Sequence, residues 1–153
     1  MNENAINFLR DSLVHHRDLK NALDHKASFL VGISGVIFTL SVGHLEKMQF
    51  LILAIGSFLT VLLAILVIFL PFRRKIKEKF GLMCWWGFSD KSFNQYKDEL
   101  NKIFNSNEEI SLEYMKEIWN LTNYSLNPKT KLLKCASSIL ILSLLSAFIL
   151  FFI

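Results

Sequence analysis

The stretch that decides the fold is ASFLVGISGVIFTLSVGHLEKMQFLILAIGSFLTVLLAILVIFL, residues 27–70. It holds two apolar runs without an acidic residue, lysine or arginine, 27–45 and 50–70, joined by the polar turn 46–49. Each run is about 20 residues long, which at roughly 1.5 Å of rise per residue crosses a hydrocarbon core about 30 Å thick. Because lipid offers no partners to backbone amides and carbonyls, such runs must be helical. The stretch therefore predicts a transmembrane helical hairpin.

The composition of the whole chain also indicates a membrane protein. Hydrophobic residues make up 52% of the 153 residues, which is high for a soluble domain. A third apolar run, 132–153, carries a single charged residue, Lys134, near its start. We therefore expect an all-α membrane protein with three transmembrane helices.

The distribution of basic residues predicts the orientation of the chain. Residues 1–26 hold four lysines and arginines, the hairpin turn holds one, and residues 71–134 hold twelve. Because basic residues concentrate on the cytoplasmic side of a membrane, we expect segments 1–26 and 71–131 in the cytoplasm. The protein would then be multi-pass with a cytoplasmic N-terminus.

The N-terminal segment 1–26 has the pattern of a helix. Residues 5–26 lack proline and glycine, and leucine or isoleucine recurs at helical spacing. We expect this helix to continue without a break into the first span. On it, Lys20 and Asp24 lie four residues apart and can form a local ion pair. His15 and His16 are adjacent and point about 100° apart, so they do not predict a metal site.

The segment between the second and third spans predicts a cytoplasmic helical hairpin. Ser89 is a candidate N-cap for its first helix, and Ser106 with Glu109 forms a candidate capping box for the second. The pair Asn127-Pro128 then restarts a helix that leads into the third span, because proline is tolerated at a first helical position.

Two features of this insert allow alternative interpretations. The basic cluster Arg73, Arg74, Lys75, Lys77 and Lys79 is typical of a segment on anionic headgroups, and phosphate or nucleic-acid binding is the alternative. Trp85 and Trp86 follow in a glycine-bounded aromatic segment. They can anchor a loop at the membrane interface or offer a stacking surface to a planar ligand.

Small residues form stripes in the first two spans. In the first span they recur at steps of three or four: Ser28, Gly32, Gly35, Thr39 and Gly43. In the second span Gly56, Thr60 and Ala64 recur at steps of four. Such stripes allow helices to approach closely, so they predict packing within the hairpin, association with a second copy, or both on different faces.

Catalytic and metal-binding patterns are absent from the sequence. It contains no glycine-rich phosphate loop, no Cys/His spacing for a metal and no nucleophile elbow. Only two cysteines occur, and their expected compartment makes a disulfide improbable. We expect no enzyme activity, no catalytic residues and no cofactor.

The order of these parts resembles a known family. A polar helix ends in Leu23-Asp24-His25-Lys26-Ala27-Ser28-Phe29-Leu30, and a glycine-containing span and a tight hairpin follow it. The blocks Trp86-Gly87-Phe88 and Ser92-Phe93-Asn94-Gln95-Tyr96 come next, and a third span completes the chain. With these elements the chain resembles the transmembrane effectors of the Pycsar antiphage systems, the PycTM family.

The resemblance implies a function. In that family a neighbouring cyclase makes a cyclic pyrimidine mononucleotide, cyclic UMP or cyclic CMP, during phage infection. The effector then impairs the integrity of the bacterial inner membrane and causes abortive infection. The implied partners are this nucleotide, the cyclase, the lipid bilayer and further copies of the chain, with no nucleic acid.

Candidate ligand-binding residues follow from the chemistry of such a nucleotide. A cyclic phosphate requires fixed cations, for which Arg17, Lys20, Arg73 and Arg74 are candidates. A pyrimidine base requires an aromatic plane, for which Trp85, Trp86 and Tyr96 are candidates. No pattern of a β-barrel nucleotide-binding domain occurs, so helices and loops would have to form this site.

A second function class fits the same sequence. A constitutive scaffold or accessory subunit of a membrane assembly would use the small-residue stripes to dock a partner. A cyclase gene beside this one would favour the effector, and a transporter operon would favour the scaffold.

Overall fold

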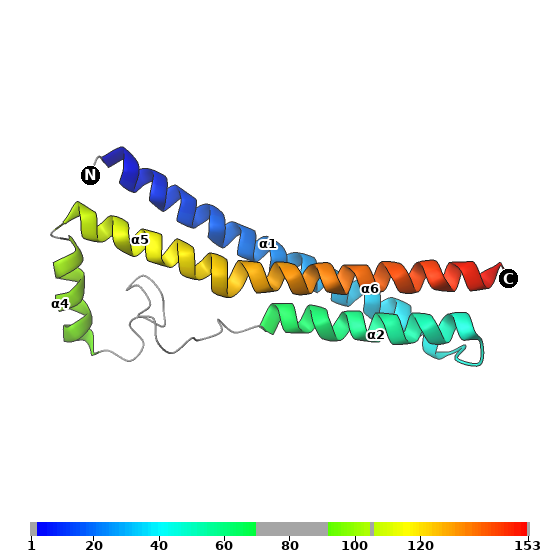
Figure 1. The fold of residues 1–153 in the computed structure, drawn as a ribbon. Coiled ribbons are helices and arrows are strands. Elements are labelled where there is room, and N and C mark those ends of the chain that lie inside the picture. The colour runs from blue at the N-terminus through cyan, green and yellow to red at the C-terminus, as the bar shows by residue number, and fades with distance from the viewer. Residues whose placement is uncertain (1–2, 70–91, 105, 153) are drawn as a thin grey trace. The chain divides into compact units, whose positions relative to one another are not determined.

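The computed structural model describes residues 3–69, 92–104 and 106–152, and every element in these ranges is helical (Figure 1). The elements in chain order are α1 (Glu3–Val42), α2 (Met48–Phe69), α4 (Phe93–Phe104), α5 (Asn107–Leu121), the π-helical turn η1 (Thr122–Leu126) and α6 (Asn127–Phe151). Three helices are long and apolar enough to cross a membrane. The prediction of an all-α chain with three potential spans is thereby confirmed.

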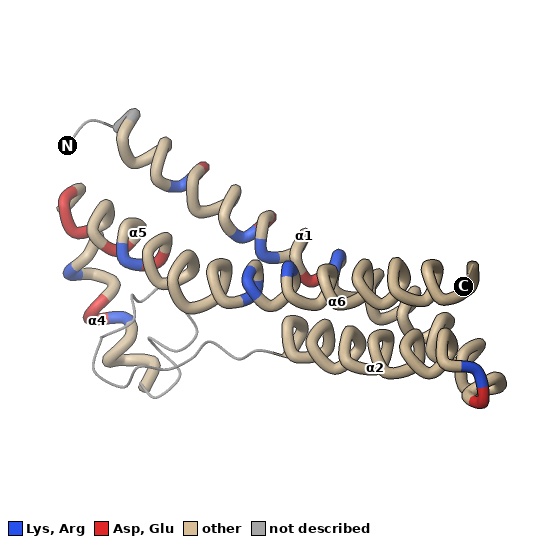
Figure 2. The backbone as a smooth tube through the Cα atoms, turned by 45° about the vertical axis from the view of Figure 1, so that its right-hand side comes forward, with Lys and Arg blue, Asp and Glu red and all other residues tan. Residues whose placement is uncertain are grey.

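The chain divides into two compact units. One contains residues 1–20 and 72–126, and the other contains residues 21–71 and 127–153, which we call the membrane unit. Figure 2 shows the charged residues along the first half of α1, along α4 and α5 and at the start of α6, and again in the turn after α1. The α2 helix and most of α6 carry none, as a hydrocarbon environment requires.

The hairpin turn is tight. Helix α1 ends at Val42, and Gly43 opens the turn that leads to Met48. The amide of His44 donates to the Ser41 carbonyl over 3.1 Å, and the amide of Lys47 donates to the His44 carbonyl over 3.1 Å. These bonds satisfy backbone groups that the ends of the helices leave without partners.

The N-terminus of α4 differs from the prediction. The helix begins at Phe93, and its cap is a reciprocal pair in which the Ser92 amide donates to Gln95 Oε1 and the Gln95 amide donates to Ser92 Oγ. Ser92 rather than the predicted Ser89 is therefore the cap, because glutamine three residues later completes a capping box. Ser89 itself lies outside the described residues. At α5 Ser106 is the N-cap as predicted, and its Oγ accepts from the Glu108 amide. The predicted capping box with Glu109 is wrong, because the Ser106 amide donates to the Ile103 carbonyl instead.

The start of α6 agrees with the prediction, since this helix begins at Asn127 with Pro128 in its first turn. The sequence did not predict the π-helical turn η1, which joins α5 to α6 without a non-helical break. Pro128 has no amide hydrogen and its ring crowds the preceding turn, and a π-helical turn is a known way to absorb both effects. Thr122 Oγ1 and Asn123 Nδ2 donate to the carbonyls of Ile118 and Trp119, which satisfies backbone acceptors here.

The core of the membrane unit lies where its three helices meet. Ala27 of α1, Ala64 and Val67 of α2 and Leu133 of α6 form a buried cluster. Helices α2 and α6 run antiparallel, because Gly56 meets Ser143 whereas the later Thr60 meets the earlier Ala136. Small residues at these positions allow the two backbones to lie close together.

Candidate functional site

Gly56 on α2 lies in close contact with Ser143 on α6 in the membrane unit. A Cβ added at Gly56 would come to 2.5 Å from Ser143 Oγ and closer still to its Cβ. Nearby, Thr60 Oγ1 donates over 2.8 Å to the Gly56 carbonyl of its own helix. The same oxygen lies 3.4 Å from the Ala136 carbonyl of α6. Of the two predicted stripes, the one on α2 therefore packs within the chain, and its partner is α6 rather than α1.

The stripe predicted on α1 packs against no other helix in the described part of the chain. A Cβ added at Gly32 or Gly35 would meet nothing within 4 Å, and at Gly43 it would meet only the Leu40 carbonyl of its own helix. Ser28 and Thr39 are exposed, and their hydroxyls donate to carbonyls one turn earlier. The interpretation of this stripe as packing inside the hairpin is wrong, because the helix turns a different face inward.

The inward face of α1 is formed by Ala27, Ser34 and Ser41. All three are buried, and they follow one another at steps of seven residues. Ser41 Oγ donates to the Ile37 carbonyl over 2.7 Å, whereas Ser34 Oγ has no hydrogen-bond partner among the described residues. The sequence analysis missed Ser34 and Ser41. Their seven-residue spacing from Ala27 is the signal that could have identified them.

Buried hydroxyls thus line the interior of the membrane unit. The set comprises Ser34, Ser41, Ser57, Thr60 and Ser143. Except for Ser34, each donates to a carbonyl of its own helix, which lets a polar residue sit among apolar helices. Such hydroxyls can exchange their own carbonyl for a partner on another helix, so this interior can rearrange without leaving polar groups unsatisfied.

An ion pair joins α1 to α6 at one edge of the apolar region. Lys129 Nζ donates to Asp24 Oδ1, and the Lys129 side chain is only 3% exposed. The sequence analysis paired Asp24 with Lys20, one turn earlier on the same helix, but the structure pairs it across helices. A lysine this deeply buried requires a compensating charge, and Asp24 is the acid that provides it.

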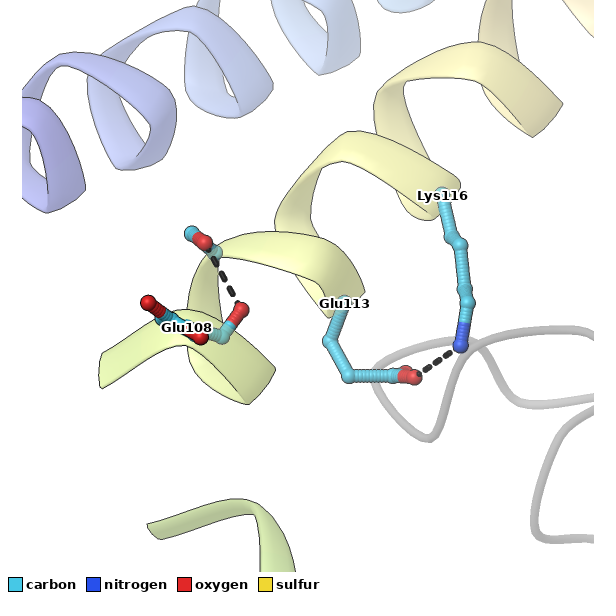
Figure 3. Close-up of polar contacts among 4 residues, drawn as sticks. Glu108, Glu113 and Lys116 are labelled. Carbon is cyan, nitrogen blue, oxygen red and sulfur yellow. Dashed lines mark hydrogen bonds and ion pairs between the residues drawn. The ribbon is translucent and has the colours of Figure 1, made fainter. Parts of the chain in front are cut away.

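The other unit contains buried carboxylates on α5. Glu113 accepts a hydrogen bond of 2.9 Å from Lys116, and Figure 3 shows these two side chains pointing toward one another. Glu117 lies one turn further along the same helix. Glu117 is 5% exposed, and its Oε2 atom has no hydrogen-bond partner among the described residues. Burial raises the pKa of Glu117; the charge of Arg17 lowers it in part, and the charge of Glu113 raises it further.

The predicted ligand-binding residues fall into two groups. Arg17, Lys20 and Tyr96 are described, belong to the same compact unit and have exposed or half-exposed side chains. Arg73, Arg74, Trp85 and Trp86 lie outside the described residues. The charge of Arg17 acts on Glu117, a residue that was not singled out from the sequence. No cluster of three metal-ligating side chains occurs in the described ranges.

Comparison with known proteins identifies a family for the chain. A family model described as PycTM, the Pycsar effector protein domain, matches residues 8–153. The match confirms the resemblance seen in the sequence and covers the potential spans together with the segment between the second and third of them. Neither the curated proteins nor the solved structures contain a match.

Proposed function

We propose that this chain, which belongs to the Pycsar effector family, is a membrane effector. Through it, a cyclic pyrimidine mononucleotide would stop phage infection. Membership makes it an antiphage effector, and its three apolar helices make it a membrane protein. The finer proposal is that cyclic UMP or cyclic CMP activates it and that it then impairs the inner membrane to cause abortive infection. We expect it to catalyse no reaction.

The observation that carries this proposal is the extent of the family match. It includes the first half of α1, the insert and the apolar helices, so one chain would contain both the sensor and the part that acts on the membrane. A neighbouring pyrimidine nucleotide cyclase would supply the ligand. The buried hydroxyls of the membrane unit support the second role, because they can change hydrogen-bond partners when the helices move.

The energetics of switching favour an oligomer. To shift an inactive state from 99% to 1% of the population, a ligand must bind the active state more tightly by about 5.5 kcal/mol. One charge-assisted hydrogen bond contributes roughly 1.5 to 3 kcal/mol, so a nucleotide that gained only one such bond in the active state would not be sufficient. Several nucleotides on an assembly of chains are sufficient. The exposed stripe of α1, with open space around Gly32 and Gly35, is the surface through which we propose that copies associate.

The nucleotide site is proposed on the cytoplasmic side. Arg17, Lys20, Arg73 and Arg74 would hold the cyclic phosphate, and Trp85, Trp86 or Tyr96 would stack on the base. The membership of Arg17, Lys20 and Tyr96 in one compact unit supports their assignment to one site. We propose that Glu117 also belongs to this site, because the charge of Arg17 acts on its carboxylate.

The orientation that this site requires can be tested separately. With the N-terminus and the insert in the cytoplasm, a cysteine placed at Met48 should react with an impermeant thiol reagent in intact cells. A cysteine placed at Asn107 should be protected until the membrane is permeabilised. The reverse pattern would contradict the proposed orientation.

The decisive experiment uses vesicles loaded with a self-quenching dye and containing the purified full chain. Addition of cyclic UMP or cyclic CMP should release dye with a sigmoidal dependence on ligand concentration. Arg17→Gln should shift the midpoint to higher concentration, whereas Arg10→Gln should not, since Arg10 already pairs with Asp11 over 3.5 Å on the same helix. Nucleotide binding without dye release would contradict membrane impairment.

A second candidate function is a constitutive scaffold of a membrane assembly. The exposed stripe of α1 is the observation in its favour, because a different membrane protein could dock on it. If neither nucleotide binds the purified chain at concentrations that its cyclase produces, the effector proposal fails and the scaffold is the better account.

A further inference from the structure

The membrane unit contains a groove between α1 and α6 that the proposed function does not use. Its lining residues are His25, Lys26, Phe29 and Leu30 of α1 with Leu133 and Ser137 of α6. The groove is shallow and open, with a volume of about 410 Å³. This volume lies within the range of roughly 300 to 1,000 Å³ that is typical of small-molecule sites.

The walls of the groove are apolar. Leu133 belongs to the buried cluster and Leu30 packs against it, whereas Phe29 leaves 69% of its surface exposed. The hydroxyl of Ser137 donates to the Leu133 carbonyl over 2.9 Å, so its hydrogen is already used within the helix. A hydrocarbon chain therefore fits these walls, whereas a strongly polar ligand would lose hydrogen bonds to water without replacing them.

The rim of the groove is cationic. His25 and Lys26 lie one turn before Phe29 and Leu30, and beyond Lys26 the first span carries no further lysine, arginine or acidic residue. The neighbouring acid, Asp24, is bound to the buried Lys129. Within the described part of the chain, Lys26 has no ion-pair partner of its own. The ammonium group of Lys26 thus remains available to an anion at the edge of the apolar region.

We propose that this groove binds one anionic phospholipid. An acyl chain lies against Phe29, Leu30 and Leu133, and the phosphate is held by Lys26, with His25 as a second donor. Charge complementarity selects this occupant, because only a lipid offers a hydrocarbon chain and an anion at the spacing of one helical turn at a membrane edge. The bound lipid would fill the space between α1 and α6 beside the Asp24–Lys129 pair.

The test is native mass spectrometry of the full chain in detergent, titrated with phosphatidylglycerol and separately with phosphatidylcholine. The parent should retain one phosphatidylglycerol more tightly than phosphatidylcholine. Lys26→Gln should weaken phosphatidylglycerol binding about fivefold, the factor that corresponds to roughly 1 kcal/mol for a lysine near an anionic lipid surface. Ser137→Phe should abolish the bound lipid by filling the groove.

The matched control is Lys134→Gln, which removes the same charge from an exposed residue beside the groove that does not line it. It should change phosphatidylglycerol binding by less than about twofold, because a single exposed charge is screened by salt. Equal weakening by Lys26→Gln and Lys134→Gln would overturn the proposal in favour of diffuse surface attraction. Retention of the lipid by a folded Ser137→Phe variant would also overturn it, and a circular dichroism spectrum of each variant establishes folding.

Discussion

The first and second membrane-spanning helices both carry small residues at steps of three or four, but the structure places the two stripes in different surroundings. On α2, Gly56 and Thr60 lie against α6, and no side chain larger than hydrogen fits at Gly56. On α1, the space around Gly32 and Gly35 is open. The same local pattern therefore marks an internal contact on one helix and an external surface on the other.

A stripe of small residues therefore shows that another helix can approach closely, but it does not show which helix does so. Helix α1 packs through Ala27, Ser34 and Ser41, a face offset by one residue, or about 100°, from the position of Gly35. Its attachment to α6 is completed by the Asp24–Lys129 pair. Among the described residues, a Cβ added at Gly32 or Gly35 of α1 meets no other helix, so this stripe is available to lipid or to a second chain.

The largest effect should come from breaking the ion pair that holds α1 to α6. Asp24→Asn leaves the buried Lys129 without a compensating charge, and such a change typically costs about 3 to 5 kcal/mol. The free energy of unfolding in detergent should fall accordingly. Asp18→Asn, at an exposed acid of the same helix, is the control and should have little effect. The double variant Asp24→Asn, Lys129→Met should recover most of the loss; no recovery would show that the pair is not the cause.

The next effect should come from the internal stripe. Gly56→Leu forces a side chain into Ser143, and overpacking of this kind typically costs about 1 to 3 kcal/mol. Thermal unfolding of the purified monomer should shift to lower temperature. Because the colliding atom belongs to Ser143, Ser143→Gly should relieve part of the loss in the double variant. A Gly56→Leu variant as stable as the parent would mean that α2 and α6 do not meet at this point.

The external stripe should give a smaller effect on stability and a distinct effect on assembly. Gly32→Leu should change the free energy of unfolding of the monomer by less than about 0.5 kcal/mol, because the added side chain meets open space. Cross-linking between copies in the membrane should decrease if the stripe is the contact between them. Unchanged cross-linking would show that the stripe faces lipid. The stripe on α2 would then contact protein, and the stripe on α1 would contact lipid.

A pH-dependent effect should appear in the other compact unit, which contains α5. The raised pKa of Glu117 means that the folded chain binds a proton more tightly than the unfolded chain. Stability should therefore rise as the pH falls from above the folded pKa of Glu117 towards its ordinary value, 4.5. At neutral pH Glu117→Gln should stabilise the chain by about 1 kcal/mol, since a neutral amide replaces a buried acceptor without a partner.

This gain should disappear at a pH where Glu117 is protonated in the parent. Glu109→Gln, at an exposed acid of the same helix, should show no such pH-dependent difference. A constant difference between parent and Glu117→Gln at all pH values would contradict the assignment. Chemical unfolding of both variants between pH 5 and 8, where the native state is typically most stable, provides the measurement.

The sequence by itself determined the helical class, the three apolar helices and the family. Uninterrupted apolar runs of about 20 residues form helices in lipid, because their backbone groups must hydrogen-bond within the run. The cap at Ser106 was predictable for a similar reason, since its side chain acts on an amide two residues away. These features depend on contacts along the chain, which a sequence displays directly.

The tertiary structure alone decided which face of α1 is internal, which acid pairs with Lys129 and where the groove lies. Asp24 and Lys129 are 105 residues apart, and local spacing favoured Lys20 as the partner of Asp24. The choice of Ala27, Ser34 and Ser41 over the glycine stripe depends on the rotation of α1 about its axis. That rotation depends on the shapes of α2 and α6 together. In lipid, helices associate through close packing, so the most favourable rotation is the one in which the whole surface of α1 fits its neighbours best.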